Sequence, residues 1–376
     1  KGDFTSNYKD TGSNWYGYYE TNMHKTIFSG EKTQKISFKE ASQVNGFSDK
    51  LELQNNDINF ATPIYNVKIN QDTQLTNTEK LMITGTLNTG GYQFATTGNI
   101  DAERLDMGGA GVEIAGDVAV RTMNVSGSDN LIKGNLMANG GGAAFKQGSL
   151  EVGGNAEFNN GFLQMQDTED KLLVKGNLTL GETYGSSKGD CLTNGTVEVK
   201  GDFTSNYKDT GSNWYGYYET NMHKTIFSGE KTQKISFKEP SQVNRFSENL
   251  ELQNNNINFA TPLYSLTVNN DMTISKTEDL QIVTQLIINN GSFVTTGNVE
   301  TNMLNINNTK ENQIQGNLNM TGTVVFKKGS LEVGGNAKFD NGYLQMQDTE
   351  DKLVVKGNMT LGETYGSSKG DCLTNG

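Results

Sequence analysis

The sequence has few of the residues that carry most enzyme chemistry and most covalent crosslinks. Its 376 residues include only 3 prolines, 2 cysteines, 2 histidines and 2 tryptophans, and its arginines are limited to Arg104, Arg121 and Arg245. No group of cysteines and histidines has the spacing of a zinc site, and no Gly-x-Ser-x-Gly motif marks a serine hydrolase. We therefore predict no catalytic residue, no metal site and no cofactor.

Charge and hydrophobicity exclude further classes of protein. The formal net charge is −12, and an acidic surface repels phosphate backbones, so we do not expect a nucleic-acid partner. No apolar run reaches the roughly 20 residues that a membrane-spanning helix needs. Hydrophobic residues make up 34% of the chain, which is lean for an enzyme of this length, yet 17 Phe and 14 Tyr argue against disorder.

The chain contains a long internal repeat. Residues 1–40 recur without change at 200–239, and residues 161–195 recur at 342–376 with three conservative changes. The offset is 199 for the first pair and 181 for the second, so a segment near 105–122 is present in the first unit and absent from the second. A globular domain seldom loses an internal segment so cleanly. A solenoid can lose one coil, because each coil contacts only its neighbours.

A shorter period runs inside both units. A glycine followed by Asn or Asp closes an alternating apolar stretch many times, at intervals of 18 to 25 residues from Gly98 to Gly201 and of 19 to 22 residues from Gly297 to Gly357. These pairs begin at Gly98, Gly116, Gly134, Gly154, Gly176, Gly201, Gly297, Gly316, Gly335 and Gly357. Alternation with a period of two predicts β-strands, and we find no convincing helical pattern.

One strand and one turn in every ~18–25 residues predict an all-β fold, a right-handed parallel β-solenoid (β-helix). At ~20 residues a coil, the chain would hold ~19 coils stacked ~4.8 Å apart. We expect inward Leu, Val, Ile and Phe to fill the core, the turn Asn to form a hydrogen-bonded ladder, and the Gly before it to take a positive φ. The predicted units are residues 1–199, which carry the extra coil, and residues 200–376, continuous with the first.

The stretch from about 20 to 95 has longer and less regular spacing. Its predicted strands are Lys25–Phe28, Lys35–Phe38, Leu51–Leu53 and Tyr65–Ile69, because each shows short apolar alternation. We expect loops to be extruded between them.

Two segments resemble repeats of very large bacterial surface proteins. His24 to Phe38 reads HKTIFSGEKTQKISF, and Gly195 to Phe203 reads GTVEVKGDF. In those proteins a segment of the form kvxFsGxxxQxIsF alternates with one of the form GxLxlkGdF along a β-helical stalk, and the wider likeness is to filamentous-haemagglutinin-like and adhesin-like β-helices. The resemblance covers most of the chain. It implies a bacterial, extracellular or cell-surface setting and a stalk or fibre role, and it transfers no catalytic residue.

One aromatic cluster occurs in each unit. Both tryptophans belong to it, and its members are Trp15, Tyr16, Tyr18 and Tyr19 with their copies Trp214, Tyr215, Tyr217 and Tyr218. Such a cluster suits a platform that stacks on a glycan or contacts a partner. It also suits a loop that caps its own coil or packs between subunits of a fibre, which is the interpretation that we favour.

The two cysteines occupy equivalent positions. Cys191 and Cys372 stand in the two copies of the same string, Asp-Cys-Leu-Thr-Asn-Gly. About nine coils at ~4.8 Å would separate them by ~40 Å, and a disulfide needs Cα atoms within about 7 Å. Each cysteine is therefore a small buried hydrophobe, which we favour, or a thiol that crosslinks to a neighbouring chain.

An acidic segment also recurs, at 166–170 and at 347–351. Its carboxylates suit Ca²⁺, but the segment lacks the nonapeptide pattern of calcium β-rolls and the glycine of an EF-hand loop. We favour a solvated turn over a calcium site.

Three classes of function fit such a fold. The first is a structural segment of an extracellular stalk or self-assembling filament. Because Gly376 corresponds to Gly195, which comes shortly before the second unit begins at Lys200, we expect further covalent repeats or end-to-end association. The second is an adhesin that binds a glycan or host protein through its aromatic loops. The third is a polysaccharide-degrading enzyme, which needs clustered Asp, Lys and Arg, and the arginines here do not align between units. We predict the structural role and no enzyme activity.

Overall fold

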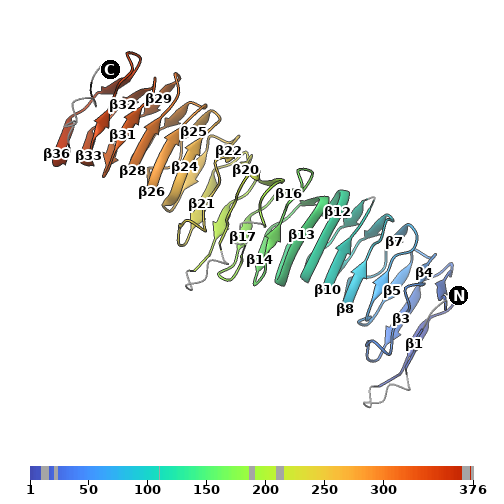
Figure 1. Cartoon of the computed structure of the whole chain (residues 1–376). Helices are drawn as coiled ribbons and strands as arrows, with labels where there is room; N and C mark the ends of the chain where they lie inside the picture. Colours follow the sequence, from blue (N-terminus) through green and yellow to red (C-terminus); the bar gives the residue numbers. More distant parts are fainter. Residues whose placement is uncertain are drawn as a thin grey trace. The chain divides into compact units, whose positions relative to one another are not determined.

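The computed structural model describes residues 1–9, 17–20, 24–109, 111–185, 191–208, 216–365 and 373. In these residues every element is a β-strand, and no helix occurs. The chain divides into two compact units, Lys1–Tyr184 and Gly185–Gly376. Figure 1 shows strand stacked on strand within each unit. The predicted all-β parallel β-solenoid is confirmed, with about 16 turns rather than the ~19 expected.

The strands of the first unit are short, apart from two long ones near its middle. They are β1 (Phe4–Ser6), β2 (Ile27–Phe28), β3 (Gln34–Phe38), β4 (Glu52–Leu53), β5 (Ile58–Phe60), β6 (Val67–Lys68), β7 (Thr73–Leu75), β8 (Lys80–Asn88), β9 (Phe94–Thr96), β10 (Asn99–Met107), β11 (Val112–Ile114), β12 (Val118–Ile132), β13 (Leu136–Val152), β14 (Ala156–Asn159), β15 (Leu163–Gln164), β16 (Lys171–Val174) and β17 (Leu178–Leu180).

The second unit is also built of short strands, and none of those described is as long as β12 or β13. Its strands are β18 (Thr196–Val199), β19 (Phe203–Ser205), β20 (Lys224–Phe227), β21 (Gln233–Phe237), β22 (Glu251–Leu252), β23 (Ile257–Phe259), β24 (Leu263–Val268), β25 (Met272–Ile274), β26 (Asp279–Ile288), β27 (Phe293–Thr295), β28 (Asn298–Ile306), β29 (Glu311–Ile314), β30 (Leu318–Met320), β31 (Val324–Phe326), β32 (Ser330–Val333), β33 (Ala337–Gly342), β34 (Leu344–Gln345), β35 (Lys352–Val355) and β36 (Met359–Tyr365).

The register of the strand pairs gives the length of each coil. In the first unit β8, β10, β12 and β13 pair in parallel, and Lys80, Asn99, Asp117 and Asn135 mark the start of successive coils. In the second unit β26, β28, β30 and β33 pair in the same way, offset by 19 where each pairing begins. The offset grows to 32 where Phe4 pairs with Ile36 and where Phe203 pairs with Ile235. These long coils explain why the chain holds fewer turns than uniform short coils would give.

The four strands predicted between residues 20 and 95 all occur. They are β2, β3, β4 and β6, and three of them are shorter than predicted. These three strands were predicted too long because the apolar alternation continues into residues whose backbone is no longer paired with a neighbouring strand.

Columns of apolar side chains fill the core. Ile100, Val118, Leu136, Ala156 and Leu178 occupy one inward position on successive coils, and each is almost completely buried. Burial of an aliphatic side chain of this size contributes about 1.5–3 kcal/mol, so a narrow core repeated coil after coil can stabilise a lean sequence.

The Asn and Asp residues of the recurring Gly-Asn and Gly-Asp pairs form a ladder in each unit. The side-chain oxygen of one ladder residue accepts a hydrogen bond from the backbone N–H of its equivalent one coil later, at 2.7–2.9 Å. The ladder residues are Asn99, Asp117, Asn135, Asn155 and Asn177 in the first unit, and Asn298, Asn317, Asn336 and Asn358 in the second. The predicted ladder is confirmed.

The glycine before each ladder residue serves a different purpose from the predicted one. None of these glycines has a positive φ. The glycines that do have one lie elsewhere, for example at Gly127 and Gly195. A Cβ on Gly134 would lie 2.5 Å from Asp117 Oδ1 and 2.6 Å from the carbonyl oxygen of Gly116. The prediction of a positive φ is therefore wrong: glycine is needed because the preceding coil leaves no room for a side chain.

A buried glutamine connects the two segments that resemble surface-protein repeats. Gln233 accepts a hydrogen bond from the N–H of Gly229 at 2.8 Å and donates to the carbonyl oxygens of Val199 and Gly201 at 3.0 and 2.7 Å. A Cβ on Gly229 would lie 2.2 Å from the carbonyl oxygen of Lys200. The spacing FSGxxxQ, from Phe227 to Gln233, thus places the side-chain amide of Gln233 against the coil that carries GTVEVKGDF.

These contacts predict the effect of a single methyl group. Gly134→Ala should lower the melting midpoint, because the new Cβ collides with backbone and costs about 1–3 kcal/mol. Gly91→Ala is the matched control, since a Cβ at Gly91 meets nothing within 4 Å. Thermal unfolding followed by circular dichroism measures both variants. Equal midpoints for the two would contradict the steric account.

Candidate functional site

The aromatic cluster divides into rings that face the core and rings that face outward. Tyr217 is fully buried, and its ring centroid lies 5.1 Å from that of Phe203 in an edge-to-face contact. The equivalent Tyr18 packs on Phe4 at 4.8 Å. The last tyrosine of each copy, Tyr19 or Tyr218, points outward. Four members of the predicted cluster lie outside the described residues: Trp15, Tyr16, Trp214 and Tyr215.

The inward tyrosines belong to a hydrogen-bonded network that occurs in both units. The hydroxyls of Tyr18 and Thr26 lie 2.8 Å apart, and Thr26 donates to one oxygen of Glu20. The other oxygen of Glu20 accepts from the backbone N–H of Ser48 at 2.7 Å. Equivalent bonds join Tyr217, Thr225, Glu219 and Ser247. The carboxylate therefore holds the aromatic segment against the next coil.

Burial and hydrogen bonding act in opposite directions on this carboxylate. Burial alone would raise the pKa of Glu20, but the hydrogen bonds from Thr26, Ser48 and Tyr18 outweigh it and hold that pKa below its usual value. Burial raises the pKa of the Tyr18 hydroxyl. Glu20 is thus an ionised structural carboxylate, and not a proton donor at neutral pH.

The two histidines adjoin the same network in different surroundings. The His223 side chain is fully buried, its Nδ1 lies 2.6 Å from the carbonyl oxygen of Asn194, and its Nε2 lies 3.6 Å from Glu219 Oε1. The His24 side chain keeps the 3.6 Å separation from Glu20 but is 57% exposed. The sequence showed only two isolated histidines, because their acidic neighbours come from the aromatic segment, whose conformation it did not reveal.

The structure also places the other residues that the sequence singled out. Cys191 is buried, and Cys372 lies outside the described residues. In the acidic segment, Asp170 accepts hydrogen bonds from the N–H groups of Gln166, Asp167 and Gly148 at 2.9, 3.0 and 3.2 Å. Both of its oxygens are engaged in closing a turn, as are those of the equivalent Asp351.

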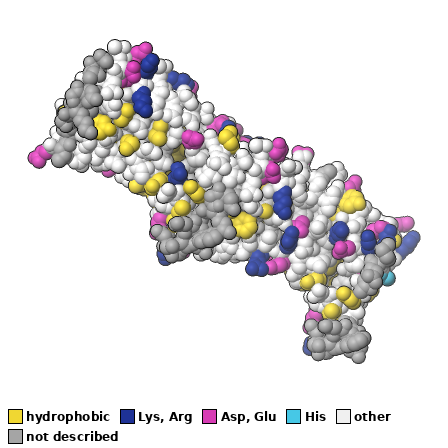
Figure 2. Space-filling view, viewed as in Figure 1, with side chains coloured by type: hydrophobic (Ala, Val, Ile, Leu, Met, Phe, Trp, Pro, Cys, Tyr) yellow, Lys and Arg dark blue, Asp and Glu magenta, His cyan; other side chains and the backbone are white. Residues whose placement is uncertain are grey.

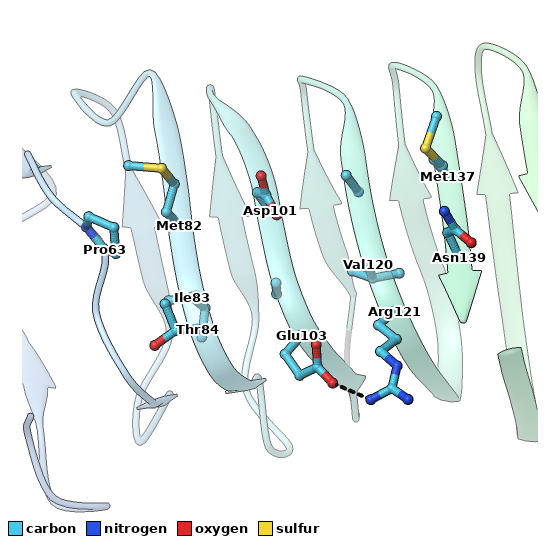
Figure 3. Close-up of a pocket in the computed structure, with 12 residues that line it drawn as sticks. Pro63, Met82, Ile83, Thr84, Asp101, Glu103, Val120, Arg121, Met137 and Asn139 are labelled. Carbon is cyan, nitrogen blue, oxygen red and sulfur yellow. Dashed lines mark hydrogen bonds and ion pairs between the residues drawn. The ribbon is translucent and has the colours of Figure 1, made fainter. Parts of the chain in front are cut away.

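A groove on the outer face of the first unit is a candidate that the sequence did not reveal. It has a volume of about 560 Å³ and crosses β8, β10, β12 and β13, beginning beside Pro63. Figure 3 shows Met82 and Met137 along the upper edge of the groove, with the ion pair of Glu103 and Arg121 along its lower edge. The Arg121 Nη1 to Glu103 Oε1 distance is 2.8 Å.

The groove follows a bend in the strands. The register of β10 shifts between Ala102 and Arg104, and that of β12 shifts between Val120 and Thr122. A bulge of this kind bends the strand and redirects its outward side chains. The apolar floor includes Ala102 and Val120, and polar groups line its edges. This arrangement suits an extended ligand with apolar faces and polar edges, as a sugar chain has.

The second unit has a smaller groove at the equivalent place. It begins beside Pro262, measures about 200 Å³, and contains Val283, Glu300 and Asn302 where the first unit has Thr84, Asp101 and Glu103. The two grooves therefore differ in size and in the residues that line them. Sequence reasoning missed both, because outward residues on alternating strands have the same pattern whether the sheet is flat or bent.

The described surface carries mixed charge. In Figure 2 Lys and Arg side chains lie beside Asp and Glu side chains on the visible face. Ion pairs join successive coils, as between Lys80 and Asp101 at 2.7 Å. Within the described ranges, no three His, Cys, Asp or Glu side chains are grouped so that they could hold a metal ion. No helix in that part of the chain is long and apolar enough to cross a membrane.

The Glu20 network predicts acid sensitivity. Because the folded pKa is lowered, its contribution to stability is present above the usual value of 4.5 and is lost as pH falls through the folded pKa. Glu20→Gln should therefore reduce stability by about 1 kcal/mol at pH 7, and the difference should shrink below pH 4.5. Thermal unfolding across this pH range measures it.

The exposed Glu31 offers the control for this prediction. Glu31→Gln changes the same charge without touching the network, so its effect on stability should be small at every pH. A Glu20→Gln effect that stays constant from neutral pH to well below 4.5 would contradict the assignment.

Comparisons with protein-family models, curated proteins and solved structures found no match to this chain. The classification of this chain therefore rests on its architecture, which is a parallel β-solenoid.

Proposed function

We propose that this chain is a structural repeat segment of an extracellular bacterial surface stalk or self-assembling filament, without catalytic activity. The observation that supports this most is the continuity of bonding from coil to coil. Ladder residues, a packed core and the buried glutamines each join one coil to the next, and they recur in both units. A scaffold is the role that such continuous and repeated bonding serves best.

A solenoid suits a stalk because its stability grows with length. Each coil contacts only its neighbours, so coils can be added or removed without a larger common core. The two long-repeat offsets differ by 18, and β10 and β12 are also offset by 18, so the units differ by the length of one coil. Length is therefore the property that this sequence can change most easily.

The extracellular setting rests on the resemblance of the two repeat segments. The structure supplies a physical reason for that pattern, since Gln34 accepts from the N–H of Gly30 at 2.7 Å and donates to the carbonyl oxygen of Gly2 at 3.0 Å. Any chain that stacks such segments would need this glutamine and this glycine in each of them. We infer that this chain shares their stalk role.

The groove supports a second candidate function, that of an adhesin for a glycan or host protein. Its lining differs between units while the core and ladder are retained, as expected when outward residues are under a separate requirement. In this proposal the first unit carries the larger ligand surface, with Met82, Met137 and Arg121 as contact residues.

Electron microscopy of the purified chain separates the two proposals. The structural proposal predicts filaments with an axial repeat of whole units, and about eight coils at ~4.8 Å give ~38 Å for each unit. Monodisperse particles that bind a glycan array, with binding lost in Arg121→Ala, would contradict the filament proposal and favour the adhesin.

A further inference from the structure

Three outward positions stack on successive coils beside the aromatic cluster. In the second unit Tyr218 forms a parallel bridge with Arg245, and Tyr264 follows one coil later. In the first unit the equivalent bridge joins Tyr19 to Gly46, and Tyr65 follows. The copies thus differ at the middle position, where one has arginine and the other has no side chain.

The second unit shows what fits between the two tyrosines. The Arg245 guanidinium carbon lies 5.8 Å from the centroid of the Tyr218 ring and 6.0 Å from that of Tyr264. Its Nε donates to the carbonyl oxygen of Gln242 at 3.0 Å. Both distances fall within the range in which an aromatic ring attracts a cation. A planar guanidinium is therefore held by two rings and one carbonyl group.

The first unit has the same backbone without that side chain. Gly46 N–H donates to the carbonyl oxygen of Tyr18 at 2.9 Å, as Arg245 N–H does to that of Tyr217. The preceding turn is also the same, because Ser42 pairs with Asn45 as Ser241 pairs with Asn244. The carbonyl group equivalent to that of Gln242 is the one of Gln43.

The two tyrosines of the first unit are left without the cation. Tyr19 is 60% exposed and Tyr65 is half-buried. A Cβ at Gly46 would meet nothing nearer than 3.4 Å, where it would touch the Cβ of Tyr65. The backbone therefore accepts a side chain at this position, and the sequence does not provide one.

We propose that Tyr19, Tyr65 and the Gln43 carbonyl bind the guanidinium of an arginine that a partner protein presents. Arginine fits because its flat, weakly hydrated group stacks on aromatic faces, whereas the lysine ammonium is compact and strongly hydrated. The net charge of −12 favours the approach of a basic segment. This site goes beyond the stalk role and does not depend on it.

The test uses the full chain labelled with 3-fluorotyrosine and followed by fluorine NMR. Tyr19→Phe and Tyr65→Phe assign the two signals. Titration with the peptide acetyl-Gly-Gly-Arg-Gly-Gly-amide should shift both signals saturably. The same peptide with lysine should bind at least about threefold more weakly.

Two matched variants exchange the residue at the middle position between the two units. Gly46→Arg should abolish the response, because it supplies the guanidinium from within, as the second unit does. Arg245→Gly should give the Tyr218 and Tyr264 signals the same response to the arginine peptide, and it keeps the proposal testable if Gly46→Arg does not fold.

Several results would overturn the proposal. They are the absence of a saturable shift at Tyr19 and Tyr65, an equal response to the lysine peptide, and a response that folded Gly46→Arg retains. Self-association that moves these signals without peptide would identify a second copy of the chain as the occupant, and so reject a separate partner.

Discussion

The backbones of successive coils approach closely at the Gly-Asn and Gly-Asp turns of the solenoid. There the Oδ1 of one ladder residue accepts the N–H of the next at 2.7–2.9 Å, and the glycine beside it lies so near the preceding coil that a methyl group would collide. This approach sets the register of the parallel strands on either side, because a slip of one residue would turn every core side chain outward. The apolar columns depend on that register, and their burial supplies most of the stability.

Long coils are possible because the same register is restored after them. Where Phe4 pairs with Ile36, and where Phe203 pairs with Ile235, buried glutamine and asparagine amides take over from the turn ladder. Asn244 accepts from Ser205 Oγ and from the N–H of Tyr217 at 2.7 and 3.0 Å, and so joins the end of β19 to Tyr217. Buried polar groups with all partners in place specify one arrangement of the chain. The outward residues are then free to differ, as Gly46 and Arg245 do.

Much of this architecture could be predicted from the sequence. The parts that could not be predicted share one cause. Alternating apolar residues and the recurring Gly-Asn pairs predicted parallel coils and an asparagine ladder, because both signals act at short range. The role of the glycines was predicted wrongly, since their constraint comes from a neighbouring coil that is distant in the sequence. The groove beside Pro63 was missed for the same reason, because a bulge between Ala102 and Arg104 is visible only in the pairing of strands. The sequence analysis did not single out Glu20 or Glu219, because only the folded chain places them beside Thr26 and Thr225.

Amide hydrogen exchange at the ladder tests the central claim most directly. If the turn N–H groups are bonded to the preceding coil, the amides of Asp117, Asn135 and Asn155 should exchange as slowly as those of the core strand β12. An ordinary exposed turn, such as the one at Gly91, should exchange much faster. Ladder amides that exchange at the rate of Gly91 would contradict the account, because the turn N–H groups would then not be bonded to the preceding coil.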